Sequence, residues 1–490
     1  MLTGQGESTN NAGVSSPANF LLQEVSIMRE NLGGQELGNQ KLNITPLISN
    51  ISISESIYKN AINVNIRVID NRKLYSTMRL NGSEKIKLII SRNSEDNDDK
   101  FNLDLVVADV HLFTEVNSDI QSYVLRCVPE YSLINQTKTI SDSFSDINET
   151  IKSICVGDLK IPHIQLDKKL RGSFGLKEGV NFTFIGKGKF KPQIPAQPAK
   201  GIYPLMKPLS VINWLVRNIS NNSTPYYFYQ TSDGKINLNS YQDMLESESV
   251  NEGNVYTNID HQSFFTSGET MKNTEQDNFE KEKFTILKLN QPANLSTVKN
   301  ISNGSYASNK FSVDIYKKEY ISNNEFEYDG MKTLNTDKPF SDNVKFGEKK
   351  LLENKTSKNY FINLNSGAFD NSEATYHDIV NDTIQKKEAY HNILDSQIQE
   401  IVINGDFQMR SGEKINLEIL QNKSGDKKFE GEELDTPDAM LSGTYLITAL
   451  EHTFENQKYL TRLRIKRDSY PVDMNKPDKV FQDNKFTVET

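Results

Sequence analysis

The chain has 490 residues, enough for roughly three domains, and 36% of them are hydrophobic. Its 56 Lys and Arg are outnumbered by 65 Asp and Glu, which leaves a net charge of -9. Such a chain is not expected to bind DNA non-specifically, because neutralising phosphates needs a surplus of basic side chains. No apolar run approaches the roughly 20 residues of a membrane helix. The two cysteines, Cys127 and Cys155, make neither a disulfide framework nor a zinc motif. We therefore expect the chain to fold in a reducing compartment without disulfide bonds or bound zinc.

The first part of the chain has the pattern of antiparallel β-structure. Residues 1–19 are polar and show no periodicity, and we expect a disordered or extended arm there rather than a signal peptide. Within 61–70, apolar residues occupy every second position from Ile62 to Val68, which is typical of a half-buried strand. Further strands are predicted over 21–28, 46–57, 84–92, 101–113 and 119–131.

The middle of the chain mixes helices and strands. Apolar residues at helical spacing predict a helix over 140–155, with Ser141 as its N-cap. A second helix is predicted over 209–220, where Trp214, the single tryptophan, is expected to pack between helix and sheet. Residues 224–241 predict a β-hairpin with an Asp-Gly turn.

The last part of the chain returns to β-structure. Residues 246–280 are polar and of uncertain structure, and 322–358 reads as a long surface loop. A helix is predicted over 372–395. Strands are predicted over 284–290, 311–320, 359–365, 399–405, 406–412, 413–421, 443–454 and 457–469. Two β-rich segments, about 20–131 and 284–469, therefore flank a mixed middle.

Reaction motifs are missing from the sequence. There is no GxxxxGK[ST], GxSxG or HExxH, and the run that starts at Gly186 lacks the third glycine and the helix of a phosphate loop. The six histidines, at positions 111, 163, 261, 377, 391 and 452, are expected at solvated or core-edge positions. The acidic run from Glu95 to Asp99 lacks the sixth-position Gly of a calcium loop and reads as a solvated hairpin tip. We predict no catalytic, cofactor-binding or metal-binding residues and no cofactor, and hence a structural or interaction role.

The C-terminal strands carry an ordered pattern that alternation alone does not explain. It runs through Gly405-Asp406, Gly412, Lys414, Ser442-Gly443, Tyr445-Leu446-Ile447, His452, Phe454, Tyr459 and Arg467-Asp468. This pattern resembles the end of phage baseplate hub proteins, which include the central hub of T-even-like contractile phages and the spike hubs of type VI secretion. Residues 123–154 and 204–241 resemble, in the same order, the hub segments in which a sheet gives way to helices and an aromatic hairpin.

The residues of this pattern also have expected local roles. Gly405 and Gly412 suit positive-φ turns between short strands. One strand face is expected to comprise Tyr445, Ile447 and Ala449, and the corresponding face of the next strand Leu460, Leu463 and Ile465. The pair Glu451-His452 is expected where its strand leaves the barrel.

The resemblance implies a mainly β protein with two tail-tube-type antiparallel β-barrel domains and smaller mixed α+β domains. Three subunits of such a hub form a ring that adapts the sixfold tail tube to the threefold spike and lines the DNA channel, without catalysis by the hub itself. The expected partners are two further copies, the central spike below, the tube or its initiator above, and wedge proteins of the baseplate. The expected location is the virion tail, after assembly in the bacterial host cytoplasm. An acidic lumen would keep DNA moving.

The expected domains follow from the same reading. They are an arm (1–19), a first tube-type barrel (20–135), a mixed middle domain whose strands return to the first barrel (136–245), a second tube-type barrel with polar loop insertions (246–469) and a polar tail (470–490). Two other classes stay open, a peptidoglycan-degrading tail-tip protein and a β-rich adhesin.

Overall fold

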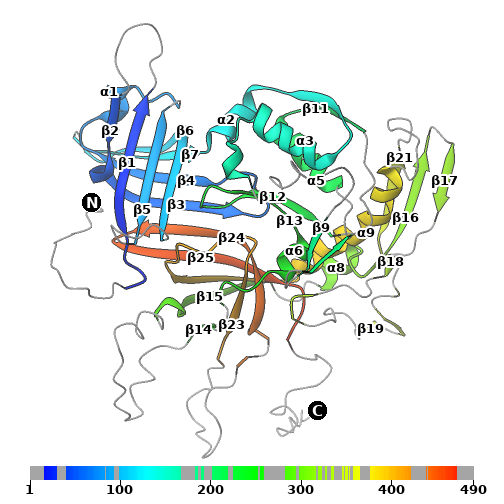
Figure 1. Ribbon diagram of the computed structural model, residues 1–490. Coiled ribbons are helices and arrows are strands. Elements are labelled where there is room, and N and C mark those ends of the chain that lie inside the picture. The colour runs from blue at the N-terminus through cyan, green and yellow to red at the C-terminus, as the bar shows by residue number, and fades with distance from the viewer. Residues whose placement is uncertain are drawn as a thin grey trace, which may run out of the picture.

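One sheet of 13 strands, antiparallel except for the short pair β14–β23, organises the computed structural model (Figure 1), so the chain is mainly β, with α+β additions, as predicted. The main path of the sheet runs β15-β22-β25-β24-β3-β4-β7-β6-β5-β1-β2, with β23 and β14 attached beside β24. The structure describes residues 16–29, 40–82, 84–92, 99–117, 119–166, 182–185, 189–192, 201–218, 224–251, 254–258, 282–293, 297–315, 318–322, 326–327, 333–335, 345–346, 348–350, 353, 357–364, 376–420, 437–438 and 440–471.

The N-terminal half of the sheet comes from the first β-rich segment. Its elements are β1 (Leu21–Arg29), β2 (Gln40–Asn43), η1 (Thr45–Leu47), β3 (Ile48–Ser56), β4 (Asn63–Asp70), α1 (Leu74–Met78), β5 (Lys85–Ser91), β6 (Lys100–Glu115) and β7 (Gln121–Val128). The alternation predicted in β4 is confirmed, because Ile62, Val64, Ile66 and Val68 are all buried. The inward side chains of these strands form one hydrophobic core.

The C-terminal half of the sheet surrounds a second core. Its strands are β14 (Tyr256–Thr257), β15 (Ile286–Ala293), β22 (Gln397–Asn404), β23 (Lys414–Glu418), β24 (Gly443–Glu455) and β25 (Lys458–Arg467). An isolated bridge between Thr257 and Thr285 brings the end of β14 beside the start of β15. The strands of this half therefore curve back on themselves around their own side chains.

The two halves are joined by backbone and side-chain contacts. Strand β24 pairs with β3 from Ala449↔Ser56 to Glu455↔Asn50, so the two segments share one continuous sheet. At the start of β25, the Tyr459 N–H donates to the carbonyl of Ala18, which precedes β1, at 2.7 Å. Among the described residues the strands form no closed barrel, and the count of two barrels stays a prediction.

The middle segment packs as a separate α+β layer with its own core. Its elements are α2 (Glu130–Thr137), β8 (Ile140–Phe144), α3 (Ile147–Ser153), the π-helical turn η2 (Ile154–Asp158), η3 (His163–Gln165), β9 (Phe182–Ile185), β10 (Lys189–Pro192), β11 (Gly201–Met206), α5 (Pro208–Asn218), β12 (Tyr226–Gln230), β13 (Ile236–Ser240) and α6 (Tyr241–Glu246). Trp214 packs against this core and contacts the Phe144 ring edge-on at 6.1 Å, as predicted.

Three predictions in and next to this segment were wrong. The helix predicted over 140–155 is strand β8 followed by α3, because β8 pairs with β11. Ser141 is not an N-cap: its hydroxyl donates to the Tyr203 carbonyl, and Asp146 caps α3 by accepting from the Glu149 N–H. The strand predicted over 119–131 ends earlier, at Val128, because Pro129 is the N-cap of α2.

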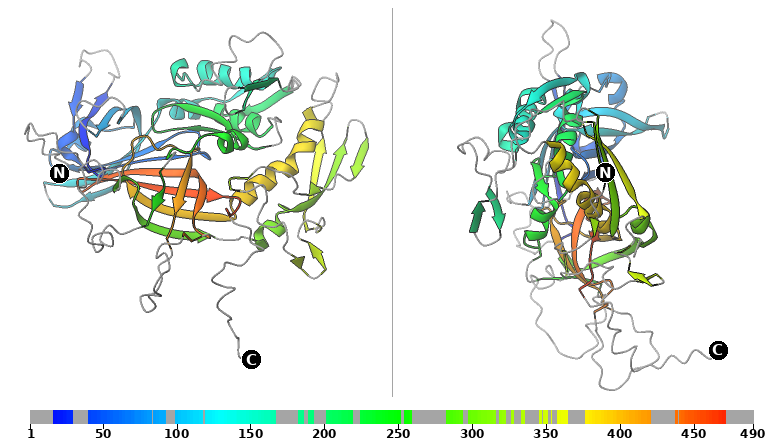
Figure 2. Two further views of the ribbon diagram at one scale, coloured as in Figure 1. Left: turned by 60° about the horizontal axis from the view of Figure 1, so that its bottom comes forward. Right: turned by 90° about the vertical axis from the view of Figure 1, so that its right-hand side faces the viewer.

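A further module, which we call the insertion, interrupts the second half between β15 and β22. It consists of α8 (Thr297–Ser302), β16 (Ala307–Asp314), β17 (Glu319–Ser322), β18 (Phe326–Glu327), β19 (Lys345–Phe346), β20 (Lys349–Lys350), β21 (Asn359–Leu364) and α9 (Tyr376–Leu394). Figure 2 shows its strands and α9 at one end of the molecule. The single strand expected over 311–320 is divided between β16 and β17, with Lys318 at φ +56° in the turn.

The surface loop predicted over 322–358 contains the short strands β18, β19 and β20. The strand expected over 406–412 is instead an irregular turn between β22 and β23. Of the described helices, none combines the length and the apolar character that crossing a membrane requires.

Candidate functional site

The C-terminal sequence pattern gathers where the two halves of the sheet meet, and we call this region the joint, defined by β3, the turn at 405–413, β24 and β25. At Gly405 a Cβ atom would lie 1.9 Å from Cδ1 of Tyr459. Gly405 has no positive φ, so the expected reason for this glycine was wrong. The position requires Gly because the Tyr459 ring lies against the backbone.

Gly412 confirms the expected turn conformation, with φ +89°. It is also close to the middle segment, since its Cβ would lie 2.2 Å from the Tyr229 hydroxyl oxygen. The Gly412 N–H donates to the Ile447 carbonyl at 2.8 Å. The turn at 405–413 is therefore held between the second half of the sheet and the β12–β13 hairpin.

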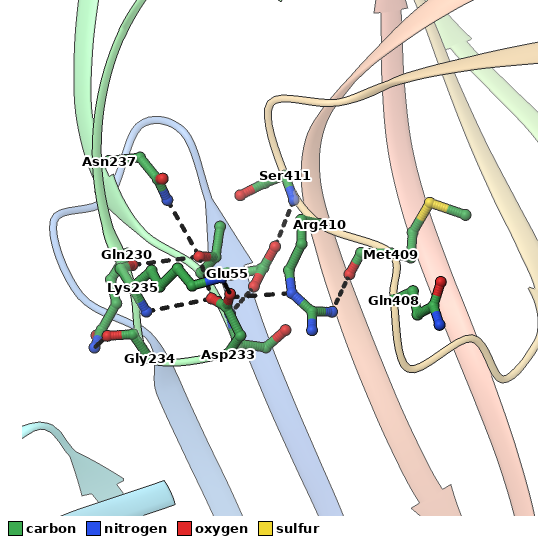
Figure 3. Close-up of polar contacts among 12 residues, drawn as sticks. Glu55, Gln230, Asp233, Gly234, Lys235, Asn237, Gln408, Met409, Arg410 and Ser411 are labelled. Carbon is green, nitrogen blue, oxygen red and sulfur yellow. Dashed lines mark hydrogen bonds and ion pairs between the residues drawn. The ribbon is translucent and has the colours of Figure 1, made fainter. Parts of the chain in front are cut away.

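A buried carboxylate connects three segments at the joint (Figure 3). Glu55 on β3 is 2% exposed and accepts the backbone N–H of Ser411 at 2.5 Å and that of Ser232 in the β12–β13 turn. Burial raises the pKa of the Glu55 carboxyl, against the opposing charge of Arg410. A buried acceptor with two backbone donors fixes the positions of both donor segments, because leaving either donor unpaired is costly.

Arg410 and two further acids surround this carboxylate. The Arg410 guanidinium donates to the carbonyls of Phe407 and Met409, each at 2.7 Å, and its Nε lies 4.0 Å from Asp233 Oδ1 (Figure 3). Burial opposes ionisation of Asp233, but hydrogen bonds from Lys235 and Thr231 lower its pKa overall. Glu413 accepts the backbone N–H of Arg410 at 2.9 Å. Burial raises the pKa of the Glu413 carboxyl to about 7.

His452 lies inside the joint, fully buried. Its Nδ1 is 2.9 Å from the Tyr459 hydroxyl, and its ring is 4.8 Å from that of Phe101. Burial lowers its pKa well below the usual range, so the ring is neutral. The expectation that Glu451-His452 marks the exit of a strand from the barrel was wrong, because both residues pair with β3 within β24. The core-edge position expected for this histidine was also wrong.

The expected strand faces hold in part. Tyr445 and Ile447 are buried together, but a bulge between Ile447 and Ala449 shifts the alternation, so Leu450 and not Ala449 continues the buried row. On β25 the buried face comprises Tyr459, Thr461, Leu463 and Ile465. Leu460 is half-exposed on the other face, contrary to expectation.

The last pair of the pattern anchors the end of β25. The Arg467 guanidinium lies between the rings of Tyr445 and Tyr470, at 4.7 and 4.5 Å, and donates to the Ser442 carbonyl at 2.6 Å. Asp468 accepts the Tyr241 hydroxyl at 2.6 Å and the Leu334 N–H at 2.9 Å. Both side chains are fully paired in the interior, as buried charges need to be.

The arrangement has the chemistry of a structural joint. Glu55 is buried and bound to backbone donors, and Arg410 is largely buried and bound to backbone carbonyls, whereas Asp233 reaches the surface beside Lys235. Within the described ranges, no three His, Cys, Asp or Glu residues gather as metal ligands do. His261 and the run at 186–188 lie outside the described residues. The structure describes the backbone of His163 and His377 but not their side chains. The prediction that the chain holds no site residues stays a prediction.

The other sequence candidates lie away from the joint or at its rim. His111 is 2.9 Å from Asp109 on half-exposed β6, and His391, in the last turn of α9, contacts the Tyr227 hydroxyl at 3.2 Å. Of the acidic run, Asp99 forms an ion pair with Arg92 at 2.9 Å, and residues 93–98 lie outside the described part.

The sequence analysis missed Glu55 and Arg410. A signal for Glu55 was present: it continues the phase of Ile51 and Ile53 on β3, both buried, so the alternation placed a carboxylate on the core face. Arg410 had no such signal, because the turn that carries it has no periodicity.

No protein-family model matches the sequence, and no curated protein does either. Several solved structures are similar. A tail protein from Neisseria meningitidis has 8% identity and a TM-score of 0.44, over 92% of this chain and 97% of its own. The 43 kDa tail protein of prophage MuSo2 from Shewanella oneidensis has 8% identity and a TM-score of 0.44, over 90% and 97%.

A component of the type VI secretion system from E. coli has 8% identity and a TM-score of 0.39, over 86% of this chain and 74% of its own. Its description reports structural similarity to T4 bacteriophage tail proteins. The structural neighbours are thus phage tail and type VI secretion proteins, the group that the C-terminal pattern resembles.

Proposed function

We propose that this chain is a structural virion protein, the central hub of a contractile-tail baseplate. In this role three copies form a ring that joins a sixfold tail tube to a threefold spike. The proposal rests on the ordered C-terminal pattern and on one architectural observation, the division of the sheet into two halves around separate cores.

This division suits an adapter between two symmetries. The second half curves around its own apolar side chains, the core of the first half also takes in Phe407, Phe454 and Tyr459 from the second, and the two halves are fused through β24 and β3. If each half acts as one tube-type barrel, a ring of three chains presents six similar units to the tube while keeping threefold symmetry for the spike. The joint then has a defined task, because it fixes the angle between consecutive units of the ring.

The buried charges of the joint support that task. Glu55 on β3 binds backbone N–H groups of two other segments, the β12–β13 turn and the turn at 405–413, so a change of angle between the halves would leave buried donors unpaired. Such losses cost about 1–3 kcal/mol for each group, and more for charged ones. A rigid hub transmits load between tube and spike without shearing.

The proposed partners follow from the ring. The spike protein binds below it, the tube or its initiator above it, and wedge proteins at the periphery, in a baseplate that assembles in the bacterial cytoplasm. DNA crosses the lumen without specific binding, consistent with the net charge of -9. The role is structural, without hydrolysis of the cell wall.

Native mass spectrometry of the chain mixed with its spike protein tests the copy number. We expect three copies of the 55.7 kDa chain, about 167 kDa, in the complex. Two or six copies would refute the adapter role. The isolated chain is expected to be monomeric at low concentration, because its interfaces are completed by the spike and the tube.

A further inference from the structure

The insertion presents an apolar sheet face to solvent. We call it the apolar face: Phe311 and Val313 on β16, Ile315 directly after this strand, Tyr320 on β17 and Phe361 on β21. Ile315, Tyr320 and Phe361 are 70%, 63% and 79% exposed. The rings of Tyr320, Phe311 and Phe361 form a row across the three strands. The Phe311 ring stacks on that of Phe361 at 5.2 Å and on that of Tyr320 at 6.4 Å.

The other side of β16 is polar and buried, the reverse of the usual alternation. Ser308, Lys310, Ser312 and Asp314 are at most 3% exposed. On the covering helix α9, the Gln385 amide donates to the Ser308 hydroxyl at 2.9 Å and to its carbonyl at 3.1 Å. A one-residue shift would exchange the two faces, so these polar contacts fix the register that turns the aromatic residues outward.

The positions of the apolar face within β16, β17 and β21 carry no charge, and the exposed Lys318 lies in the turn that follows Ile315. The remaining positions are Asn309, Ser322, Asn359 and Asn363. In a chain with 25% charged residues, a neutral face of this kind suits an uncharged protein surface rather than a phosphate or an acidic ligand. Its two most exposed rings offer about 300 Å², a part of the roughly 800 Å² that each partner buries in a stable interface.

A second apolar patch, the β6 patch, lies beside α1. It consists of Leu112, Phe113 and Val116, which are 65%, 44% and 61% exposed, and the Phe113 ring packs at 5.3 Å on that of Tyr75. Leu112 has φ +52°, within an irregularity of the β6–β7 pairing. Positive φ is rare for a bulky residue, and here it accompanies the break in the pairing that leaves Leu112 exposed.

The two surfaces lie at opposite ends of the molecule. Figure 1 and the left view of Figure 2 both place the N-terminal strands and α1 at one end and the strands of the insertion at the other. We propose that the apolar face docks on the β6 patch of a second copy of this chain. This contact rests on the proposed function and names the surfaces that close its ring.

A second copy fits better than a single foreign partner for a geometric reason. A ring of identical chains needs two different matching surfaces on each chain, because its contacts are head-to-tail. Two apolar patches at opposite ends meet that need. A symmetric pairing of the apolar face with itself would use one patch only and would stop at a dimer.

Cysteine cross-linking tests the contact in the full chain. Both native cysteines are buried, so Phe361→Cys and Phe113→Cys are introduced together and treated with a short bismaleimide at high protein concentration. We expect a ladder of dimers and trimers from the double variant and monomers from each single variant. The control pairs Phe113→Cys with Val298→Cys, which is 82% exposed on α8 of the same insertion, and should give no ladder.

Three results would overturn the proposal. Dimers from Phe361→Cys alone would show that the apolar face pairs with itself. A double variant with an unchanged melting temperature and no ladder, alone or with the spike, would assign the face to another protein or another segment of the chain. A ladder equal to that of the control pair would show random collision.

Failure of this contact can be told from failure of the proposed hub. Three copies with the spike but no 113–361 link would refute this contact alone, whereas a specific ladder with another copy number would refute the proposed hub.

Discussion

The close contact at Gly405 offers a sharp test of how the joint is built. Replacing Gly405 with Ala would place a methyl carbon 1.9 Å from Cδ1 and 2.1 Å from Cγ of Tyr459. The ring cannot easily move away, because it stacks on Phe454 at 4.4 Å and its hydroxyl contacts His452. The added methyl must therefore displace either the turn or the ring.

Overpacking of a tight core costs typically 1–3 kcal/mol, and we expect Gly405→Ala near the upper end because the nearest atoms belong to a buried ring. In a domain of 150–250 residues, about 3 kcal/mol lowers the melting temperature by roughly 6–12 °C. The matched control is Gly157→Ala, since no atom lies within 4 Å of its Cβ position. It should leave the melting temperature unchanged or slightly raised.

Thermal unfolding of the two variants measures the difference, and a double-mutant cycle assigns it. In a Tyr459→Ala background, Gly405→Ala should lose most of its cost, because the ring that it meets is gone. Equal melting temperatures for Gly405→Ala and Gly157→Ala would refute the contact. An unchanged cost in the Tyr459→Ala background would show that the strain lies in the backbone.

Three further predictions concern the same core and its chemistry. Tyr445→Asp should destabilise the second half by several kcal/mol, because it places a charge among buried side chains; a soluble variant with the parental melting temperature would contradict this. Burial raises the pKa of Glu413 from an ordinary 4.5 to about 7, so the folded chain keeps a proton that the unfolded chain releases, and stability should fall as the pH rises from about 4.5 to 7. Denaturant titrations should show a smaller fall for Glu413→Gln, and identical pH profiles would refute the assignment. Purified chain should release no more peptidoglycan fragments than buffer; lysis that one Glu or Asp substitution abolishes would overturn the structural role.

Much of the β-structure could be predicted from the sequence, because alternation at period two reflects one-sided burial. Strand β4 and the last pair, β24 and β25, are examples. Alternation failed to predict the structure where contacts with distant segments determine the local conformation. Residues 140–144 have helical spacing of apolar residues, yet they pair with β11. The bulge after Ile447 shifted the buried row of β24, and no local signal marks it.

The sequence pattern marked β24 and β25 of the joint, but neither its turn nor the contacts that hold it. The order of glycines and aromatics pointed to the correct strands, but the reason for Gly405 is a ring 54 positions later in the chain, at Tyr459. The buried carboxylate of Glu55 depends on partners from two distant segments, Ser232 and Ser411. Contacts between distant segments leave no periodic trace, so the network became visible only in the folded chain.

A cryo-electron microscopy map of the assembled tail tests the central claim most directly. The account predicts that three copies of this chain surround the tail axis between tube and spike, with six similar β-units lining the channel and α1 of each copy facing the insertion of the next. A map that places the chain away from the axis, or around it in any number other than three, would contradict the proposed hub.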